Sequence, residues 1–181
     1  DGKSYPKFLL PEQIEINPEQ SQYEEREDNR HISYLEALNT TLKEEFRLNP
    51  NTFLWGQDVA SKNKNGVFNV CKGMLHEFGN ERIFNSPIAE DNIVGTANGF
   101  CRYRDDVRVV IEGAEFADYF WPAMEQLVEC SHDYWRTKGQ FSPNILIRLA
   151  SGGNIQGGLY HSQNLEATFA TLPGIRIVTP A

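Results

Sequence analysis

The segment RIFNSPIAEDNIVGTANGFCRYRDDVRVVIEG, residues 82–113, sets a strand, a helix and a second strand in direct succession. The first strand is the short run RIFNSP, and the last is VRVVIEG, which is rich in the β-branched residues that favour strands. Between them, a run of small and apolar residues from Glu90 to about Arg104 predicts a helix with acids in its first turn. This order predicts a parallel sheet with a crossover helix.

The same alternation continues toward the N-terminus. The run FLWGQDV, residues 53–59, reads as a short buried strand, and VFNVCKGMLHEFGNE, residues 67–81, predicts a helix that Gly79 closes. Before them, apolar residues recur at helical spacing, at Ile32, Leu35, Leu38, Leu42 and Phe46. We therefore expect another helix ahead of the first strand.

Toward the C-terminus, residues 117–137 predict a long helix, and NILIRLA (144–150) and GIRIVTP (174–180) predict two more strands. A glycine-rich loop and a short helix are expected between those strands. The strands are continuous apolar runs, as is typical when helices cover both faces of a sheet. The sequence thus predicts an α/β fold, a doubly wound and mainly parallel sheet with helices on both faces.

The composition is that of an ordinary globular chain with a local excess of acid. The 181 residues carry a net charge of −8, which argues against nucleic acid or an anionic membrane as a partner. No apolar run approaches the roughly 20 residues that span a bilayer. Acids crowd between Pro11 and Arg30, so we expect residues 1–30 to be an acidic arm or linker and residues 31–181 to form one domain.

Three cysteines, Cys71, Cys101 and Cys130, are widely spaced and form no Cys-x-x-Cys pair. Neither a zinc site nor a disulfide framework is supported by that spacing. We expect buried thiols in a reducing cytoplasm, and we expect no metal ligands in this chain.

Ligands of open α/β sheets bind beyond the carboxyl ends of the strands. The polar residues expected there are Gln57, Asp58, Glu90, Glu112, Glu115 and His161. No dinucleotide fingerprint, phosphate-binding loop or nucleophile elbow occurs at the spacing those sites need. From the residues alone, Glu90 could simply complement a helix N-terminus, His161 could be structural or functional, and His132 is more typical of a surface or core histidine.

The motifs "GQDVA", "PIAE" within residues 66–90, "FADYFWPAMEQLV" and "GGLYHSQNLEATFATLPGIRIVTP" occur together in this order. In them the chain resembles the β subunit of the thiamine-dependent 2-oxo-acid dehydrogenases, in its pyrimidine-binding domain, from about Ile32 to Ala181. "FADYFWPA" and "LYHSQNLEA" look closer to the branched-chain (2-oxoisovalerate) members than to the pyruvate enzymes. Pyruvate and acetoin dehydrogenases share most of the pattern.

The resemblance implies roles for five residues. Glu90 would hydrogen-bond a ring nitrogen of the aminopyrimidine of thiamine diphosphate and drive the proton exchange that activates the thiazolium carbon. Tyr119 would pack on the pyrimidine, with Ile88 and Glu115 beside it. His161 would assist protonation of intermediates and transfer to the lipoyl group. Glu115 departs from the polar or thioether side chain usual in the family.

Gln57 is a second departure, because an acid is usual at its position. In the family that acid belongs to a chain of carboxylates that links paired active sites, so the resemblance does not imply such communication here. The diphosphate and its Mg²⁺ are bound in the family by a motif of the α subunit that is missing from this sequence. We therefore expect this chain to be part of a fused α–β polypeptide or a two-subunit enzyme, with Mg²⁺ on the partner domain.

The implied function is oxidative decarboxylation of a branched-chain 2-oxo acid, 3-methyl-2-oxobutanoate, with transfer of the acyl group to a lipoyl domain. The implied partners are an α-type thiamine-diphosphate-binding domain and a lipoyl-bearing acyltransferase, in a homo- or hetero-oligomer. The alternatives are a pyruvate or acetoin dehydrogenase β subunit, a transketolase-type enzyme, or a non-catalytic interaction domain that lost the cofactor. This chain alone is expected to be inactive.

Overall fold

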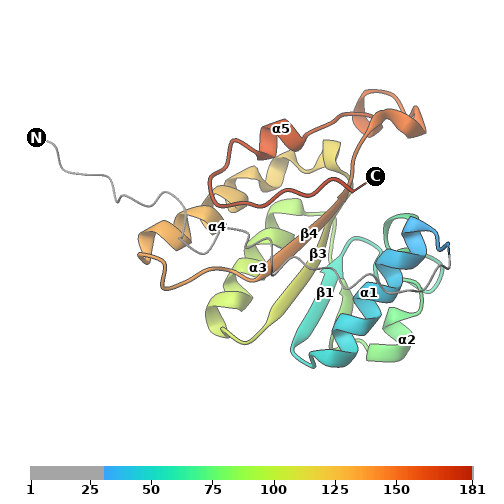
Figure 1. The fold of residues 1–181 in the computed structure, drawn as a ribbon, viewed down its shortest axis with the longest axis horizontal. Helices are drawn as coiled ribbons and strands as arrows, with labels where there is room; N and C mark the ends of the chain where they lie inside the picture. The colour runs from blue at the N-terminus through green and yellow to red at the C-terminus, as the bar shows by residue number, and fades with distance from the viewer. Residues whose placement is uncertain (1–30, 181) are drawn as a thin grey trace, which may run out of the picture. The chain divides into compact units, whose positions relative to one another are not determined.

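A computed structural model describes residues 31–180, and the acidic arm expected at residues 1–30 lies outside them. Within the described residues, strands of one parallel sheet lie in the order β2-β1-β3-β4. Their bounds are β1 (Thr52–Gly56), β2 (Ile83–Asn85), β3 (Arg108–Phe116) and β4 (Ile145–Ala150). The parallel sheet predicted from the alternating pattern is confirmed (Figure 1).

The segment 82–113 forms a crossover whose two strands, β2 and β3, lie on either side of β1. Leu54 of β1 lies opposite Ile83 of β2 on one side and opposite Val110 of β3 on the other. The strand–helix–strand unit therefore joins the two neighbours of β1 rather than two adjacent strands. On the far side of β3, Val110 lies opposite Leu146 of β4.

Helices cover both faces of the sheet, as predicted (Figure 1). One face carries α1 (Tyr34–Leu48) and α2 (Met74–Phe78), and the other carries α3 (Glu90–Tyr103) and α4 (Met124–Arg136). Side chains of β3 pack into both layers, because successive side chains of a strand point to opposite faces of the sheet. Val110 packs in the α1/α2 layer, whereas Val109 and Ile111 pack in the α3/α4 layer.

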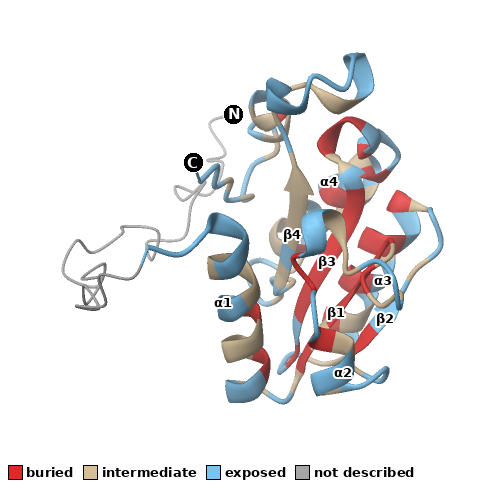
Figure 2. Ribbon diagram, turned by 90° about the vertical axis from the view of Figure 1, so that its right-hand side faces the viewer, coloured by how far each residue is buried: buried red, intermediate tan, exposed pale blue. Residues whose placement is uncertain are grey.

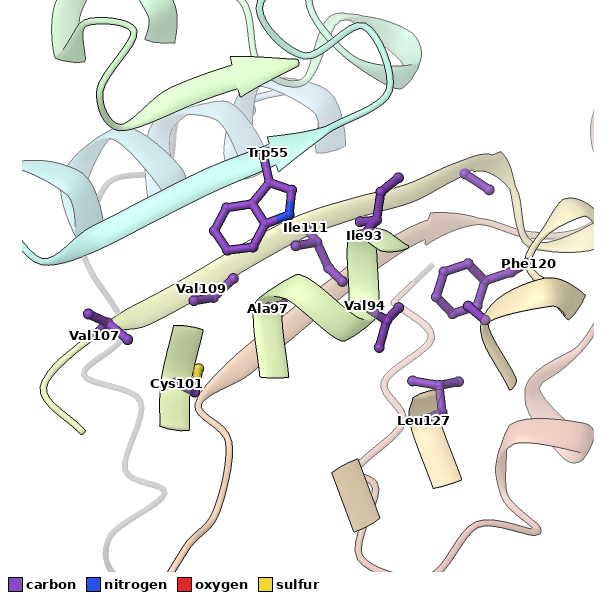
Figure 3. Packing of buried hydrophobic residues seen from close by; sticks show 12 residues of the cluster. Trp55, Ile93, Val94, Ala97, Cys101, Val107, Val109, Ile111, Phe120 and Leu127 are labelled. Carbon is purple, nitrogen blue, oxygen red and sulfur yellow. The ribbon is translucent and has the colours of Figure 1, made fainter. Parts of the chain in front are cut away.

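The α3/α4 layer holds the larger apolar core, shown in Figure 3. Ile93, Val94 and Ala97 of α3 are fully buried there, and the ring of Phe120 packs beside them. A Cβ at Gly113 would lie 2.1 Å from the Phe120 ring, so this strand position admits only glycine. The central strands β1 and β3 are accordingly the most buried part of the sheet (Figure 2).

The helix predicted over residues 67–81 is shorter than expected. Only Met74–Phe78 is α-helical, and Gly79 closes it as predicted, donating its backbone N–H to the carbonyl of Leu75 at 3.0 Å. Ahead of it lies a 3₁₀ turn, η2 (Val67–Asn69), in which Phe68 and Asn69 have positive φ. An α-helix cannot include such residues, so the prediction was wrong for residues 67–73.

The helix predicted over residues 117–137 begins later than expected. Two 3₁₀ turns, η3 (Ala117–Tyr119) and η4 (Trp121–Ala123), precede α4. Pro122 has no backbone N–H to donate, so it suits the start of a helix and not its interior. The end of the helix is as predicted, because Thr137 is its C-cap.

The strand predicted over residues 174–180 is absent, so that prediction was wrong. Ile175 packs against the α3/α4 core, and the Ser131 hydroxyl on α4 donates to the carbonyl of Pro173. The apolar residues of this run thus bury side chains without joining the ladder of β4. Between β4 and this run lie η5 (Gly153–Ile155), η6 (Leu159–His161) and α5 (Glu166–Phe169), which confirms the expected loop and short helix.

Among residues 31–180, every helix is too short or too polar to cross a bilayer.

Candidate functional site

The parallel strands end at one edge of the sheet, and four of the candidate residues follow those ends. Gln57 comes directly after β1, and Glu90 is the first residue of α3, which follows β2. Tyr119 ends the 3₁₀ turn after β3, and His161 ends η6 in the loop after β4. The placement that the sequence predicted for Gln57, Glu90 and His161 is therefore observed, whereas Glu115, expected after the third strand, lies within β3 (Arg108–Phe116).

Glu90 and Gln57 form a buried pair at this edge. Gln57 Nε2 donates a hydrogen bond to Glu90 Oε1 at 3.0 Å and lies 3.4 Å from the carbonyl oxygen of Gly113. Glu90 is 9% exposed, whereas its neighbour Asp91 is exposed. Both acids lie in the first turn of α3, where a negative charge is favourable. Helix complementation explains the exposed Asp91, but it does not explain why Glu90 is buried with an amide partner.

The second part of the site is an aromatic cluster of Phe68, Phe116, Tyr119, Tyr160 and His161. The His161 ring meets Phe116 edge-on at 4.6 Å and Tyr119 edge-on at 5.4 Å, measured between ring centroids. Tyr160 stacks on Tyr119 at 5.6 Å, and Phe68 contacts Phe116 at 6.0 Å. The imidazole thus contacts two rings from residues 116–119, and Phe68 and Tyr160 pack on those two rings in turn.

Glu112 does not join this site. It is 1% exposed and lies in the α1/α2 layer, where it accepts hydrogen bonds from Arg148, from the Cys71 thiol at 3.0 Å and from the Val67 backbone at 2.9 Å. The alternation of β3 turns it away from the layer in which Ile111 packs. The expectation that the acids of this edge converge is wrong for Glu112, which is a structural anchor.

The remaining candidates are open to solvent. Ile88 is 83% exposed and Tyr119 is 41% exposed, and Glu115 is also exposed. Asp58 pairs with Lys64 at 2.6 Å, and that hydrogen bond holds the pKa of Asp58 below its ordinary value. In the described part of the chain, no three side chains of His, Cys, Asp or Glu gather as metal ligands would.

The cysteines are free thiols in the described structure. Cys71 and Cys101 are buried as expected, whereas Cys130 is only partly buried. Burial raises the pKa of all three, to about 12 for Cys130, and so disfavours the reactive thiolate.

Sequence reasoning missed two neighbours of the site, Tyr160 and Asp118. Tyr160 stacks on the ring of Tyr119. The buried carboxyl group of Asp118 accepts hydrogen bonds from the backbone of Ser162 and Gln163, next to His161. Asp118 directly precedes Tyr119, and Tyr160 directly precedes His161. Their position next to residues that the motifs had singled out was the only signal in the sequence. Ile88 and Tyr119 thus offer exposed apolar surface, and Glu90 offers a buried carboxyl group.

Comparisons with known proteins identify the family of the chain. A family model described as "Transketolase, pyrimidine binding domain" matches residues 30–181. The chain is 38% identical over 151 residues to the 2-oxoisovalerate dehydrogenase subunit beta of Bacillus subtilis (strain 168), covering 83% of the chain and 45% of that protein. It is 35% identical over 156 residues to the 2-oxoisovalerate dehydrogenase subunit beta 2, mitochondrial, of Arabidopsis thaliana, covering 85% of the chain and 42% of that protein.

A further relative carries a different name. The chain is 32% identical over 151 residues to the pyruvate dehydrogenase E1 component subunit beta of Acholeplasma laidlawii, covering 83% of the chain and 45% of that protein. The chain thus spans less than half the length of these relatives. The matched region includes every strand, helix and site residue described above, and the chain belongs to the transketolase pyrimidine-binding domain family.

Proposed function

We propose that this chain is the pyrimidine-binding part of the thiamine-diphosphate-dependent decarboxylating component of a 2-oxo-acid dehydrogenase. The substrate is a branched-chain 2-oxo acid, 3-methyl-2-oxobutanoate, and the acyl group passes to a lipoyl domain. The observation that carries this proposal is the buried Glu90, paired with Gln57 at the ligand-binding edge of a sheet whose relatives are named 2-oxoisovalerate dehydrogenase β subunits.

Glu90 is the residue that handles a proton at the cofactor site. Gln57 donates to Oε1, which favours Oε1 as the acceptor and leaves Oε2 to carry and exchange the proton. A carboxyl group on a buried, preorganised helix start keeps its orientation while that proton moves. When bound, thiamine diphosphate supplies the electron sink that a 2-oxo acid needs to lose carbon dioxide.

Tyr119 and Ile88 present exposed apolar surface on which a pyrimidine ring would bind. Glu115 is exposed on the strand just before Phe116, and we propose that it borders the same ring. His161 would donate or accept a proton at an imidazole nitrogen late in the cycle, with its ring held edge-on by Phe116 and Tyr119. Glu90 and His161 are thus the proposed catalytic residues.

The partners follow from the relatives, which are named β subunits. We propose that an α-type domain binds the diphosphate and its Mg²⁺ against this edge. That domain is on the same or a separate chain, in a homo- or hetero-oligomer that delivers the acyl group to a lipoyl-bearing acyltransferase. The expected cytoplasmic location and the arm at residues 1–30 stay predictions.

The alternative substrate is pyruvate, because one relative is named a pyruvate dehydrogenase β subunit. Acetoin dehydrogenase and transketolase-type activities share the same cofactor chemistry. A non-catalytic interaction domain has less support, since an unused Glu90 would not need burial beside Gln57.

The test uses the full-length protein with its α-type partner. We expect thiamine diphosphate to bind in the presence of Mg²⁺, measured by calorimetry, and kcat/KM to favour 3-methyl-2-oxobutanoate over pyruvate. A tenfold preference for pyruvate, about 1.4 kcal/mol in transition-state binding, would reverse the substrate assignment. Absence of cofactor binding would contradict the proposal and favour a non-catalytic interaction domain.

A further inference from the structure

Asp118 joins the two segments that carry Tyr119 and His161. It lies in η3, directly before Tyr119, and is 1% exposed. Its Oδ1 accepts hydrogen bonds from the backbone N–H groups of Ser162 at 3.3 Å and Gln163 at 3.0 Å, across 44 and 45 residues of chain. Because Ser162 follows His161, this carboxylate is bonded to the backbone immediately beside the imidazole.

The loop of His161 has few other polar attachments. The backbone N–H of Gly152 and the hydroxyl of Ser151 donate to the carbonyl of Gln163, and the N–H of His161 lies 3.3 Å from the carbonyl of Gly158. These bonds stay within residues 151–163. In the described part of the chain, the two bonds to Asp118 are the hydrogen bonds that attach residues 157–163 to the end of β3.

The loop needs such an attachment because glycines make it pliable. Gly152 and Gly158 have positive φ, and a Cβ at Gly157 would lie 2.5 Å from the Cβ of His161. Glycine-rich backbone populates many conformations, so ring contacts alone would leave the imidazole a wide range of positions. Two hydrogen bonds from adjacent backbone N–H groups to one side-chain oxygen restrict that range.

The burial of Asp118 is costly for stability alone. Among the described residues, Asp118 Oδ2 and Ser162 Oγ are buried without a hydrogen-bond partner. A half-satisfied buried carboxylate is less favourable than an apolar residue of similar volume. We attribute the burial of Asp118 to the fixed position that it gives the loop of His161.

We infer that Asp118 is a positioning residue for His161: it fixes the backbone on both sides of the Tyr119–His161 contact. This role rests on the proposed function of His161. The tie itself is a property of the fold and can be measured without turnover.

The first experiment measures backbone hydrogen exchange at Ser162 and Gln163 in the full-length protein, by mass spectrometry of peptides that cover the loop. We expect Asp118→Leu to speed exchange there about tenfold or more, because the acceptor is lost. Asp118→Asn keeps an amide oxygen that can accept both bonds, so exchange should stay near that of the wild type. Asp133→Asn, a buried aspartate on α4, is the matched control and should leave this loop unchanged.

The second experiment separates positioning from general stability by a double-mutant cycle with His161→Ala. We expect Asp118→Leu to lower acceptor-coupled turnover about tenfold, with the Kd for thiamine diphosphate within threefold of wild type. In the His161→Ala background the same change should cost less than twofold, because the group that it positions is gone. If Asp118→Leu does not fold, Asp118→Ser replaces it, since a shorter hydroxyl cannot span both N–H groups.

Unchanged exchange at Ser162 and Gln163 in Asp118→Leu or Asp118→Ser would overturn the inference. A full tenfold loss in the His161→Ala background would also overturn it, because Asp118 would then act independently of His161. If the wild-type enzyme shows no turnover on any 2-oxo acid, the proposed function fails, and with it the role of His161. The exchange measurement still decides whether Asp118 holds the loop.

Discussion

Gln57 donates a hydrogen bond from Nε2 to Oε1 of Glu90 at 3.0 Å, joining the end of β1 to the start of α3. Both side chains are at least nine-tenths buried, so the amide and the carboxyl group have little access to other partners. The amide supplies a donor, which an acid at the same position would supply only when protonated. The identity of residue 57 therefore decides whether Glu90 Oε1 faces a neutral hydrogen-bond donor.

Gln57→Glu should make the stability of the domain fall as the pH rises. Two carboxyl groups at hydrogen-bond distance cannot both ionise without repulsion, so the variant pair would share a proton and have one raised pKa. A raised folded-state pKa contributes stability that is present at low pH and lost as pH rises through that pKa. We expect destabilisation relative to wild type of about 1–3 kcal/mol at pH 8 and clearly less at pH 5.

The measurement is urea unfolding at both pH values, with Gln140→Glu on the exposed surface as the control. The same destabilisation at pH 5 and pH 8 would show that residues 57 and 90 do not share a proton.

Arg148→Met should destabilise the domain strongly, because it leaves the buried carboxylate of Glu112 without its cation. Removing one partner of a buried ion pair typically costs about 3–5 kcal/mol. Adding Glu112→Leu to that variant should recover part of the loss, since the unpaired charge is removed. Arg47→Met, which breaks the exposed pair with Glu77, is the control and should change little. Additive losses in the double variant would contradict this account.

Asp133→Asn should destabilise the protein at neutral pH and progressively less in acid. Burial raises the pKa of Asp133, but hydrogen bonds from Asn98 and Arg102 outweigh it, so the folded-state pKa lies below the ordinary 3.8. A depressed pKa contributes stability that is present above the unfolded pKa and lost as pH falls through the folded pKa. We expect a difference of about 1–3 kcal/mol at pH 7 that shrinks below about pH 4.

Thermal or urea unfolding across that pH range checks this prediction. Asp105→Asn, on the exposed turn before β3, should show no such trend. A constant difference between wild type and Asp133→Asn from pH 7 to pH 3 would contradict the assigned pKa direction.

The layered fold was predictable because its strands and helices are periodic over short distances. The errors occur where a distant residue decides the local conformation. Residues 67–73 have a helical pattern, but the backbone N–H of Val67 donates to Glu112, 45 residues away, and the two residues that follow have positive φ. The run 174–180 alternates like a strand, yet Ile175 packs against the α3/α4 core and the backbone of this run forms no ladder with β4.

The candidate site divides in the same way. Its edge was predictable, because parallel strands end together and Gln57, Glu90 and His161 each follow a strand. The roles of Glu90 and His161 came from motifs that resemble a family, not from periodicity. The hydrogen bonds around these residues were not predictable. Gln57 bonds Glu90 across 33 residues of chain, and Asp118 bonds the backbone of Ser162, next to His161, across 44. Only the folded structure brings those atoms within hydrogen-bond distance.

The measurement that tests the central proposal most directly is deuterium exchange at the thiazolium carbon of bound thiamine diphosphate. We expect Glu90→Gln to slow this exchange by about 10²–10⁴-fold, because the amide keeps the size of the side chain but loses the exchangeable proton. Asp91→Asn, in the same helical turn but exposed, is the matched control and should exchange like wild type. An exchange rate in Glu90→Gln within threefold of wild type, with the cofactor still bound, would show that Glu90 is not the activating acid.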